Sequence, residues 1–383
     1  MMWHEVIGQQ EIKQGLVNMV QSGKLPHALL LLGPEGCGNL ALAIALARYL
    51  HCENRNADSA CGACPSCHKY GRFIHPDCYF TYPVVKSEKQ TSPPISADYI
   101  TEWRNALAEN PYLTYPDWMQ IIRAENKQGN ITARECRQII QQLHLKTFEG
   151  SHKIQIIWLP EFLGNEGNIL LKILEEPPPY THFILVSENA DNILTTILSR
   201  VQIIKVPPIS DPDLSAYLQQ HYETDAEAAL RIARIAEGNL CAALQICEGK
   251  NNANDRVLRQ WLLLCYQLRH KPTATGFSEL TRWLDEFSAS GRENQKVFIR
   301  YALYFIRECV AILATGSSAK LFGEELNFAT KFTARLDVES LEQIQILFNQ
   351  LHYHIERNAN PKILFMSASW QIADILTAPV AAS

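Results

Sequence analysis

The 383-residue sequence contains no long uncharged hydrophobic run. Its most apolar stretch, residues 297–313, is interrupted by Arg300, Arg307 and Glu308. Because a helix needs about 20 predominantly apolar residues to cross a bilayer, we expect no membrane-spanning segment. The first residues also lack the basic segment and the apolar run of a secretory signal peptide. We therefore expect a cytoplasmic protein.

The chain also lacks an excess of basic residues, since 35 Lys and Arg stand against 40 Asp and Glu and the net charge is -5. Dedicated nucleic-acid-binding proteins usually carry a strong basic excess, so we discount that class except for a local patch. Apolar residues are not scarce: 47% of the residues are hydrophobic and 20% are charged. These proportions exclude a disordered chain and are typical of a globular protein.

The cysteines do not suit a disulfide-bonded protein, because their number, 11, is odd and seven of them are scattered. The other four, Cys52, Cys61, Cys64 and Cys67, fall within 16 residues. In a reducing compartment such a cluster indicates a metal site. Four thiolates match a tetrahedral structural Zn²⁺ site that leaves no position for water. We therefore predict a zinc module over residues 52–67.

Other interpretations of this cluster stay open. The spacing of Cys61, Cys64 and Cys67 resembles part of a ferredoxin run, which would hold an iron–sulfur cluster, and the four residues can also be plain free cysteines. Further candidate ligands close by are His51, His68, His75 and Cys78. Zinc knuckles bind nucleic acid, but Lys69 and Arg72, which follow the cluster, form no clear platform of basic and aromatic residues. A scaffold role is therefore the stronger expectation.

The first half of the chain alternates between strand and helix patterns. Short apolar runs that predict buried strands lie at residues 28–32, 154–158, 183–187 and 202–206. Helical patterns at 133–145 and 168–174 separate them. This alternation predicts an α/β domain with a parallel sheet.

After the prolines at 207 and 208 only helical patterns follow. We predict three domains: an α/β domain over 1–207, a small helical lid over 208–249 and a helical domain over 250–383. Residues 84–118 interrupt the alternation with prolines and charged residues. We interpret them as a surface insertion in the α/β domain.

A glycine-rich turn follows the first predicted strand, where a phosphate-binding Walker A loop belongs. Gly33, Gly36 and Gly38 let its backbone N–H groups curl around an anion. However, Asn39 stands where that motif has its lysine, and Leu40 stands where it has the hydroxyl that binds Mg²⁺. The strand 154–158 also ends at Trp158 rather than at the carboxylates of a Walker B motif. We therefore predict a degenerate loop that binds no ATP, although weak anion binding stays open.

Several motifs resemble the clamp-loader branch of the AAA+ ATPases. They are Val-Ile-Gly-Gln at 6–9, His-Ala-Leu-Leu at 27–30, Leu-Leu-Lys-Ile-Leu-Glu-Glu-Pro-Pro at 170–178, Thr-Ile-Leu-Ser-Arg-Val at 196–201 and Gly-Asn-Leu-Cys at 238–241. The resemblance covers about residues 1–250 and is weaker beyond. In the last motif Cys241 replaces the arginine that touches nucleotide in that family.

The resemblance implies a non-catalytic clamp-loader subunit of the DNA polymerase III holoenzyme. Such a subunit would act as a stator in a heteropentamer with gamma/tau and delta subunits, assembled through a helical collar at 250–383. Its indirect partners would be the sliding clamp and primer–template DNA.

The resemblance also implies that Arg200 is an arginine finger, which completes the ATP site of a neighbouring gamma/tau subunit in trans, and that Ser199 shapes its loop. The plain alternative is that Arg200 caps a helix or pairs with a surface carboxylate. Two further functions stay open: an active AAA+ ATPase with an atypical Walker A loop, and a zinc-dependent nucleic-acid-binding module.

Overall fold

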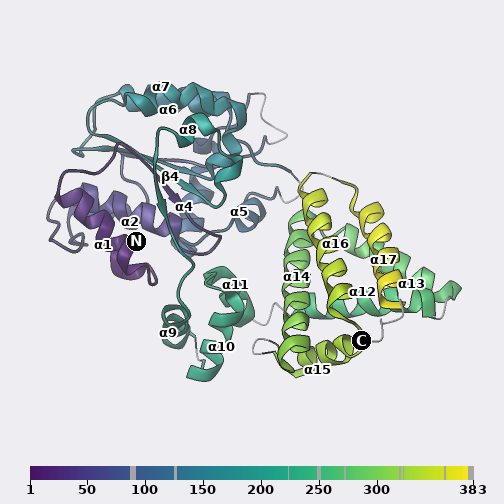
Figure 1. Ribbon diagram of the computed structural model, residues 1–383. Coiled ribbons are helices and arrows are strands. Elements are labelled where there is room, and N and C mark those ends of the chain that lie inside the picture. Colours follow the sequence, from purple (N-terminus) through teal and green to yellow (C-terminus); the bar gives the residue numbers. More distant parts are fainter. Residues whose placement is uncertain are drawn as a thin grey trace. The chain divides into compact units, whose positions relative to one another are not determined.

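The protein forms two compact units, Met1–Cys247 and Glu248–Ser383, in a computed structural model (Figure 1). The structure describes residues 1–86, 92–124, 127–222, 224–247, 252–270, 273–318, 321, 323–357 and 359–377. The predicted division into three domains stays a prediction.

The first unit is built on a parallel sheet in the order β2-β3-β4-β1-β5. Its strands are β1 (Ala28–Leu32), β2 (Cys78–Thr81), β3 (Lys153–Trp158), β4 (Thr181–Ser187) and β5 (Gln202–Lys205). Each strand pattern found in the sequence therefore corresponds to a strand, and β2 is an additional one. The runs of apolar residues in β1, β3 and β4 follow from their burial on both faces of the sheet.

Helices cover both faces of this sheet (Figure 1). Those of the first part of the chain are α1 (Gln10–Gln21), α2 (Asn39–His51), α3 (Pro65–Gly71), α4 (Ile100–Glu109), α5 (Tyr115–Ile121), α6 (Ala133–His144), α7 (Leu171–Glu175) and α8 (Thr195–Leu198), with short 3₁₀ segments at Trp3–Glu5, Ser96–Tyr99, Pro160–Leu170 and Ala190–Asn192. Alternate residues of β1 divide between the two faces: Leu29 and Leu31 pack in the core with α2, and Leu30 packs in the core with α6. At 168–174, where the sequence predicts a helix, the structure has the end of the 3₁₀ segment Pro160–Leu170 followed directly by α7.

The interpretation of residues 84–118 as a surface insertion is wrong for the described part of that segment; residues 87–91 lie outside the described residues. Trp103 and Trp118 are fully buried in the main core of the unit. The Trp103 ring stacks on Tyr82 with 4.0 Å between ring centroids, and it lies 5.2 Å from Trp158. Large aromatic side chains dominate the energetics of a core, so this segment is part of the domain's folding unit.

Replacing Trp103 with alanine is expected to lower the free energy of unfolding by about 3–5 kcal/mol, because a large buried ring leaves a cavity. Urea unfolding followed by circular dichroism measures the change. Trp370→Ala is the matched control: Trp370 is 36% exposed, so its loss should cost roughly 1 kcal/mol or less. Equal changes in the free energy of unfolding for the two variants would contradict a major contribution of Trp103 to the core.

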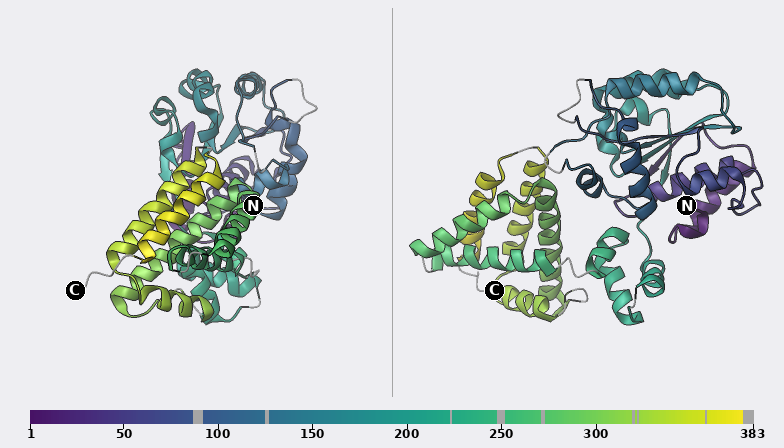
Figure 2. Two further views of the ribbon diagram at one scale, coloured as in Figure 1. Left: turned by 90° about the vertical axis from the view of Figure 1, so that its right-hand side faces the viewer. Right: turned by 180° about the vertical axis from the view of Figure 1, so that it is seen from behind.

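Among the described residues after β5, all of the regular elements are helices. The first unit ends with α9 (Asp211–His221), α10 (Ala226–Ala236) and α11 (Leu240–Cys247). The second unit contains α12 (Asn252–His270), α13 (Ala274–Ser288), α14 (Arg292–Thr315), α15 (Gly323–Thr333), α16 (Val338–Glu356) and α17 (Pro361–Thr377). These helices gather in a bundle with its own core, in which Trp261 stacks on Trp283 with 5.3 Å between centroids (Figure 2).

The predicted fold class, a parallel-sheet α/β domain followed by helices, is confirmed. Across the described parts of the chain, no helix combines the length and the apolar character that a membrane crossing requires.

Candidate functional site

The glycine-rich turn at 33–38 joins β1 to α2, as the sequence predicted, but the chain's own side chains cover it. Gly36 and Gly38 have φ values of 73° and 92°, which favour glycine. A Cβ atom on Gly36 would lie 2.0 Å from Oδ1 of Asn239, and a Cβ atom on Gly38 would lie 2.8 Å from the ring of Tyr112. The space that these glycines leave open therefore holds Asn239 and Tyr112.

Asn39, which replaces the Walker A lysine, points back into the protein. Its Nδ2 donates to the carbonyl oxygens of Gly33 at 3.3 Å and of Ser187 at 3.2 Å. Its Oδ1 accepts from the backbone N–H of Leu40 at 2.8 Å. The side chain thus ties the loop to the end of β4 and occupies an N–H group that a bound phosphate would need.

The carboxylate closest to the Walker B position is also committed to internal contacts. Oε1 of Glu161 accepts hydrogen bonds from the backbone N–H groups of Glu188 at 3.0 Å and Asn189 at 3.1 Å, and from the Ser187 hydroxyl. Burial raises the pKa of Glu161, although these donors oppose the shift. β3 itself ends at Trp158, which packs in the aromatic core. This arrangement provides no carboxylate for a metal–nucleotide complex at the end of β3.

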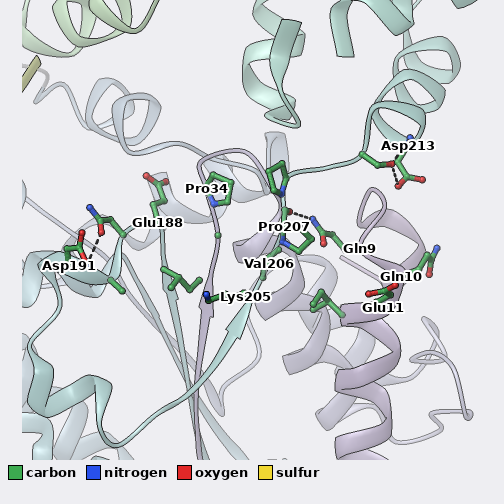
Figure 3. A pocket seen from close by; sticks show the side chains of 17 residues that line it. Gln9, Gln10, Glu11, Pro34, Glu188, Asp191, Lys205, Val206, Pro207 and Asp213 are labelled. Atoms are coloured by element: carbon green, nitrogen blue, oxygen red, sulfur yellow. Dashed lines mark hydrogen bonds between the residues drawn. The ribbon is translucent and has the colours of Figure 1, made fainter. Parts of the chain in front are cut away.

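A cavity of about 1040 Å³ opens at the carboxyl ends of β1, β4 and β5, the edge where parallel sheets place their ligands (Figure 3). Its acidic lining residues are Glu11, Glu188, Asp191 and Asp213. Of the lining residues that the structure describes, Lys205 alone is basic. At its rim Nε2 of Gln9 bridges the carbonyl oxygens of Cys37 at 3.1 Å and Pro207 at 2.6 Å. This lining is electrostatically unfavourable for a polyphosphate.

Arg200 lies just after α8 and both caps the end of that helix and pairs with a surface carboxylate, the two roles of the plain alternative. Nη1 donates to the carbonyl oxygen of Thr196 at 2.9 Å, at the end of the helix. Nε and Nη2 both donate to Oε2 of Glu175 at 3.3 Å. Ser199 supports the group, because its hydroxyl donates to Thr196 at 3.1 Å and accepts from Nη1 at 3.3 Å. Sequence reasoning did not find Glu175 as the partner.

The Arg200 contacts leave the guanidinium partly open to solvent. The Arg200 side chain is 31% exposed, and that of Glu175 is 61% exposed. Ion pairs of this kind contribute about 0–1 kcal/mol. The guanidinium can therefore exchange Glu175 for another anion at little cost.

The four clustered cysteines come together in space. The sulfur atoms of Cys52, Cys61, Cys64 and Cys67 all lie within 4.8 Å of one another, and the group could hold a metal ion. Backbone N–H groups already point at three of these sulfurs: Cys61 N at Cys52 Sγ (3.1 Å), Cys64 N at Cys61 Sγ (3.3 Å) and Cys67 N at Cys64 Sγ (3.4 Å). Such donors stabilise thiolates, so the donor set fits a tetrahedral metal site.

Among the residues that the structure describes, the four-sulfur group does not include the alternative ligands His51, His68, His75 and Cys78. His51 bonds instead to the hydroxyl of Tyr70 at 2.6 Å and to the carbonyl oxygen of His152 at 2.8 Å. It also stacks on His75 with 4.1 Å between ring centroids. Cys78 is buried in β2 and lies outside the four-sulfur group.

Tyr112 is a second residue that sequence reasoning missed. Its hydroxyl accepts from the backbone N–H of Ile7 at 2.8 Å, and the side chain is buried. Its position within residues 84–118 gave no signal of this role, because its contacts lie far away in the sequence.

Comparison with known proteins assigns the chain to a family. The family described as "DNA polymerase III, delta subunit" matches residues 8–210, more than half of the chain. DNA polymerase III subunit delta' of Yersinia pestis is 28% identical over 72% of this chain and 69% of its own length. The delta' subunit of Escherichia coli strain K12 is 25% identical over 62% of this chain and 59% of its own length.

A solved gamma-subunit-related protein of Thermotoga maritima has a TM-score of 0.41 at 15% identity, covering 95% of this chain and 99% of that one. The family match over residues 8–210 decides the assignment. This chain belongs to the DNA polymerase III delta-subunit family, with the delta' subunits among its relatives.

Proposed function

We propose that this chain is a delta'-type, non-catalytic subunit of a DNA polymerase III clamp loader. It would work in the cytoplasm as a stator beside gamma/tau and delta subunits, through which it would reach the sliding clamp and primer–template DNA. The family match and the delta' relatives support this assignment. The observation that carries it is a nucleotide loop filled by its own Tyr112 and Asn239, in a chain that keeps a partly exposed Arg200.

The absence of intrinsic ATPase activity is part of this proposal. Phosphoryl transfer needs positive charge and a metal ion to balance the γ-phosphate. Asn39 brings no charge and is held by Gly33 and Ser187, and Glu161 is occupied by the backbone after β4. The acidic cavity beside the loop adds electrostatic repulsion. Each feature opposes nucleotide binding independently.

Arg200 would then act on a neighbour's nucleotide. A guanidinium is planar and permanently charged, so it can neutralise charge that develops on a transferred phosphoryl group. Glu175 would hold the guanidinium near its working position in the free chain, and Thr196 and Ser199 would orient it through their hydrogen bonds with Nη1. A γ-phosphate carries more negative charge than a solvent-exposed carboxylate, which favours the exchange of partners.

The cysteine cluster would hold one structural Zn²⁺ ion. A zinc ion there would fix the segment between α2 and α3, because Cys52 follows α2 directly and Cys64 is the N-cap of α3. All four protein ligands would be thiolates, so the site would leave no open position for chemistry. Its role in this proposal is therefore to support the fold.

The experiment that tests the proposed function is reconstitution. Gamma/tau and delta subunits are mixed with and without this chain, and clamp loading onto primed DNA is measured with the ATPase rate. We expect loading to depend on this chain, and the isolated chain to hydrolyse no ATP. Turnover by the isolated chain, or loading that is equally fast without it, would overturn the proposal.

A further inference from the structure

Three segments that are distant in the sequence meet at the N-terminus of α2. They are the first loop of the chain at Ile7, the segment Asn110–Tyr112, and the turn Asn239–Cys241 that opens α11. The last of these belongs to the helices α9–α11, which follow the sheet after Pro207 and Pro208. The contacts among these segments therefore help to hold the helices α9–α11 against the α/β part of the same unit.

Tyr112 contacts all of the parts that meet there. Its ring lies against Gly38, so that a Cβ on that glycine would be 2.8 Å from the ring. Its hydroxyl accepts from the N–H of Ile7 at 2.8 Å, and its carbonyl oxygen accepts from the thiol of Cys241 at 3.1 Å. One residue thus bridges the first loop, the glycine-rich turn and α11.

The neighbours of Tyr112 complete a closed set of contacts. Oδ1 of Asn110 accepts from the N–H of Tyr112 at 2.9 Å, which fixes the turn that presents the ring. The N–H of Leu240 donates to the carbonyl oxygen of Gly36 at 3.2 Å. Nδ2 of Asn239 donates to Oε1 of Glu35 at 3.3 Å. These bonds join the turn at 33–38 directly to the start of α11.

The burial of Tyr112 indicates that it contributes a large part of the free energy that holds these segments together. The side chain is 6% exposed, and an aromatic ring of this size is a major source of burial energy. The polar contacts around it are single hydrogen bonds, neutral except for that of Asn239 to the Glu35 carboxylate, and each is weak beside the burial of an aromatic ring. Without the ring, single hydrogen bonds and the apolar side chains of α9–α11 that share the main core, among them Leu214 and Leu240, would remain. An interface weakened in this way opens more often.

We propose that Tyr112 is a built-in latch, which fills the space at the glycine-rich turn and holds helices α9–α11 closed against the α/β part without any bound ligand. The orientation of these helices is then a fixed property of the chain and does not depend on a nucleotide. The latch rests on contacts within the first unit, so it stands whether or not the chain works in a clamp loader.

The test compares Tyr112→Ala with the native full-length chain. Alkylation of each cysteine by iodoacetamide is followed by mass spectrometry, and exchange of the Leu240 amide is followed by hydrogen–deuterium exchange. Burial raises the pKa of the Cys241 thiol to about 12, so alkylation, which needs the thiolate, is slow in the closed state. We expect both rates to rise at least roughly tenfold in the variant, because the latch opens locally.

Each readout has an internal control. Cys136 in α6 and Cys265 in α12 are fully buried in other cores than that of Tyr112, so their alkylation rates should stay at the native value. Leu240 bonds to Gly36 and not to Tyr112, so its faster exchange reports opening rather than the loss of shielding by the ring. Tyr99→Ala removes a half-buried tyrosine whose hydroxyl bonds to Val85 O at 2.8 Å, and it should leave both rates unchanged.

Tyr112→Phe keeps the ring and removes only the hydroxyl that accepts from Ile7. We expect a rise in both rates that is smaller than in Tyr112→Ala, and this variant decides the question if the alanine variant does not fold. Native rates at Cys241 and Leu240 in folded Tyr112→Ala, or in Tyr112→Phe when the alanine variant is unfolded, would overturn the latch. These readouts need no partner subunit, so a failed reconstitution leaves them unaffected.

Discussion

Replacing Arg200 with alanine is expected to abolish hydrolysis at the neighbouring ATP site that the proposed finger completes, while the complex still assembles. Arginine fingers contribute about 10³–10⁵ to the rate of phosphoryl transfer. The fold of this chain should be unaffected, since the ion pair that is lost joins Arg200 to an exposed Glu175 and contributes at most about 1 kcal/mol. The measurement is the DNA- and clamp-stimulated ATPase rate of the reconstituted complex, with assembly checked by gel filtration.

Three further variants separate a finger from a merely structural arginine. Arg200→Lys keeps the charge but loses the planar fork, so it should restore only part of the rate. Glu175→Gln releases the guanidinium from its resting partner without removing it, so hydrolysis should persist. Arg231, paired with Glu227 at 3.8 Å on α10, is the matched control, and Arg231→Ala should leave the rate unchanged. A native rate for Arg200→Ala in an assembled complex would remove this residue from the mechanism.

The parts of the fold that the sequence predicted are those coded by local patterns. β1 is a continuous apolar run and β4 contains one at 183–186, and their short length and flanking turn residues favour strands over helices. β2 was missed because it has four residues, two of which are only half-buried. The segment after β2 was misread because its prolines and charged residues dominate the pattern, whereas Trp103 and Trp118 reach the core through packing that no local pattern reveals.

The candidate sites divide in the same way. The four cysteines lie within one short segment, so their spacing alone predicted that they would meet. The contact of Arg200 with Thr196 is also local, at a separation of four residues. Glu175 and Tyr112 escaped sequence reasoning because their partners are 25 to 129 residues away. The lack of a lysine at 39 and of a hydroxyl at 40 could be read from the sequence, but the side chains that fill the space at the turn could not.

Replacing Cys64 with serine is expected to remove the proposed metal ion and to destabilise the first unit strongly. Structural Zn²⁺ sites in peptides contribute about 10–16 kcal/mol at pH 7. Only part of that would be lost here, because the helices around the cluster also pack in a large apolar core. We expect the native chain to contain one zinc per molecule by elemental analysis, and the variant to contain none and to melt more than about 10 °C lower.

Serine is the informative replacement, because it separates the two roles of Cys64. The Cys64 sulfur is the N-cap of α3 and accepts from the N–H of Cys67. Serine is a good N-cap, so the variant keeps the helix start and loses only the thiolate. Cys78→Ser is the matched control: Cys78 is buried close by but lies outside the four-sulfur group, so it should keep its zinc. A metal-free native chain, or a Cys64→Ser variant that retains a full equivalent of zinc, would show that these thiols do not form a structural zinc site, and α3 would then depend on its cap and on core packing alone.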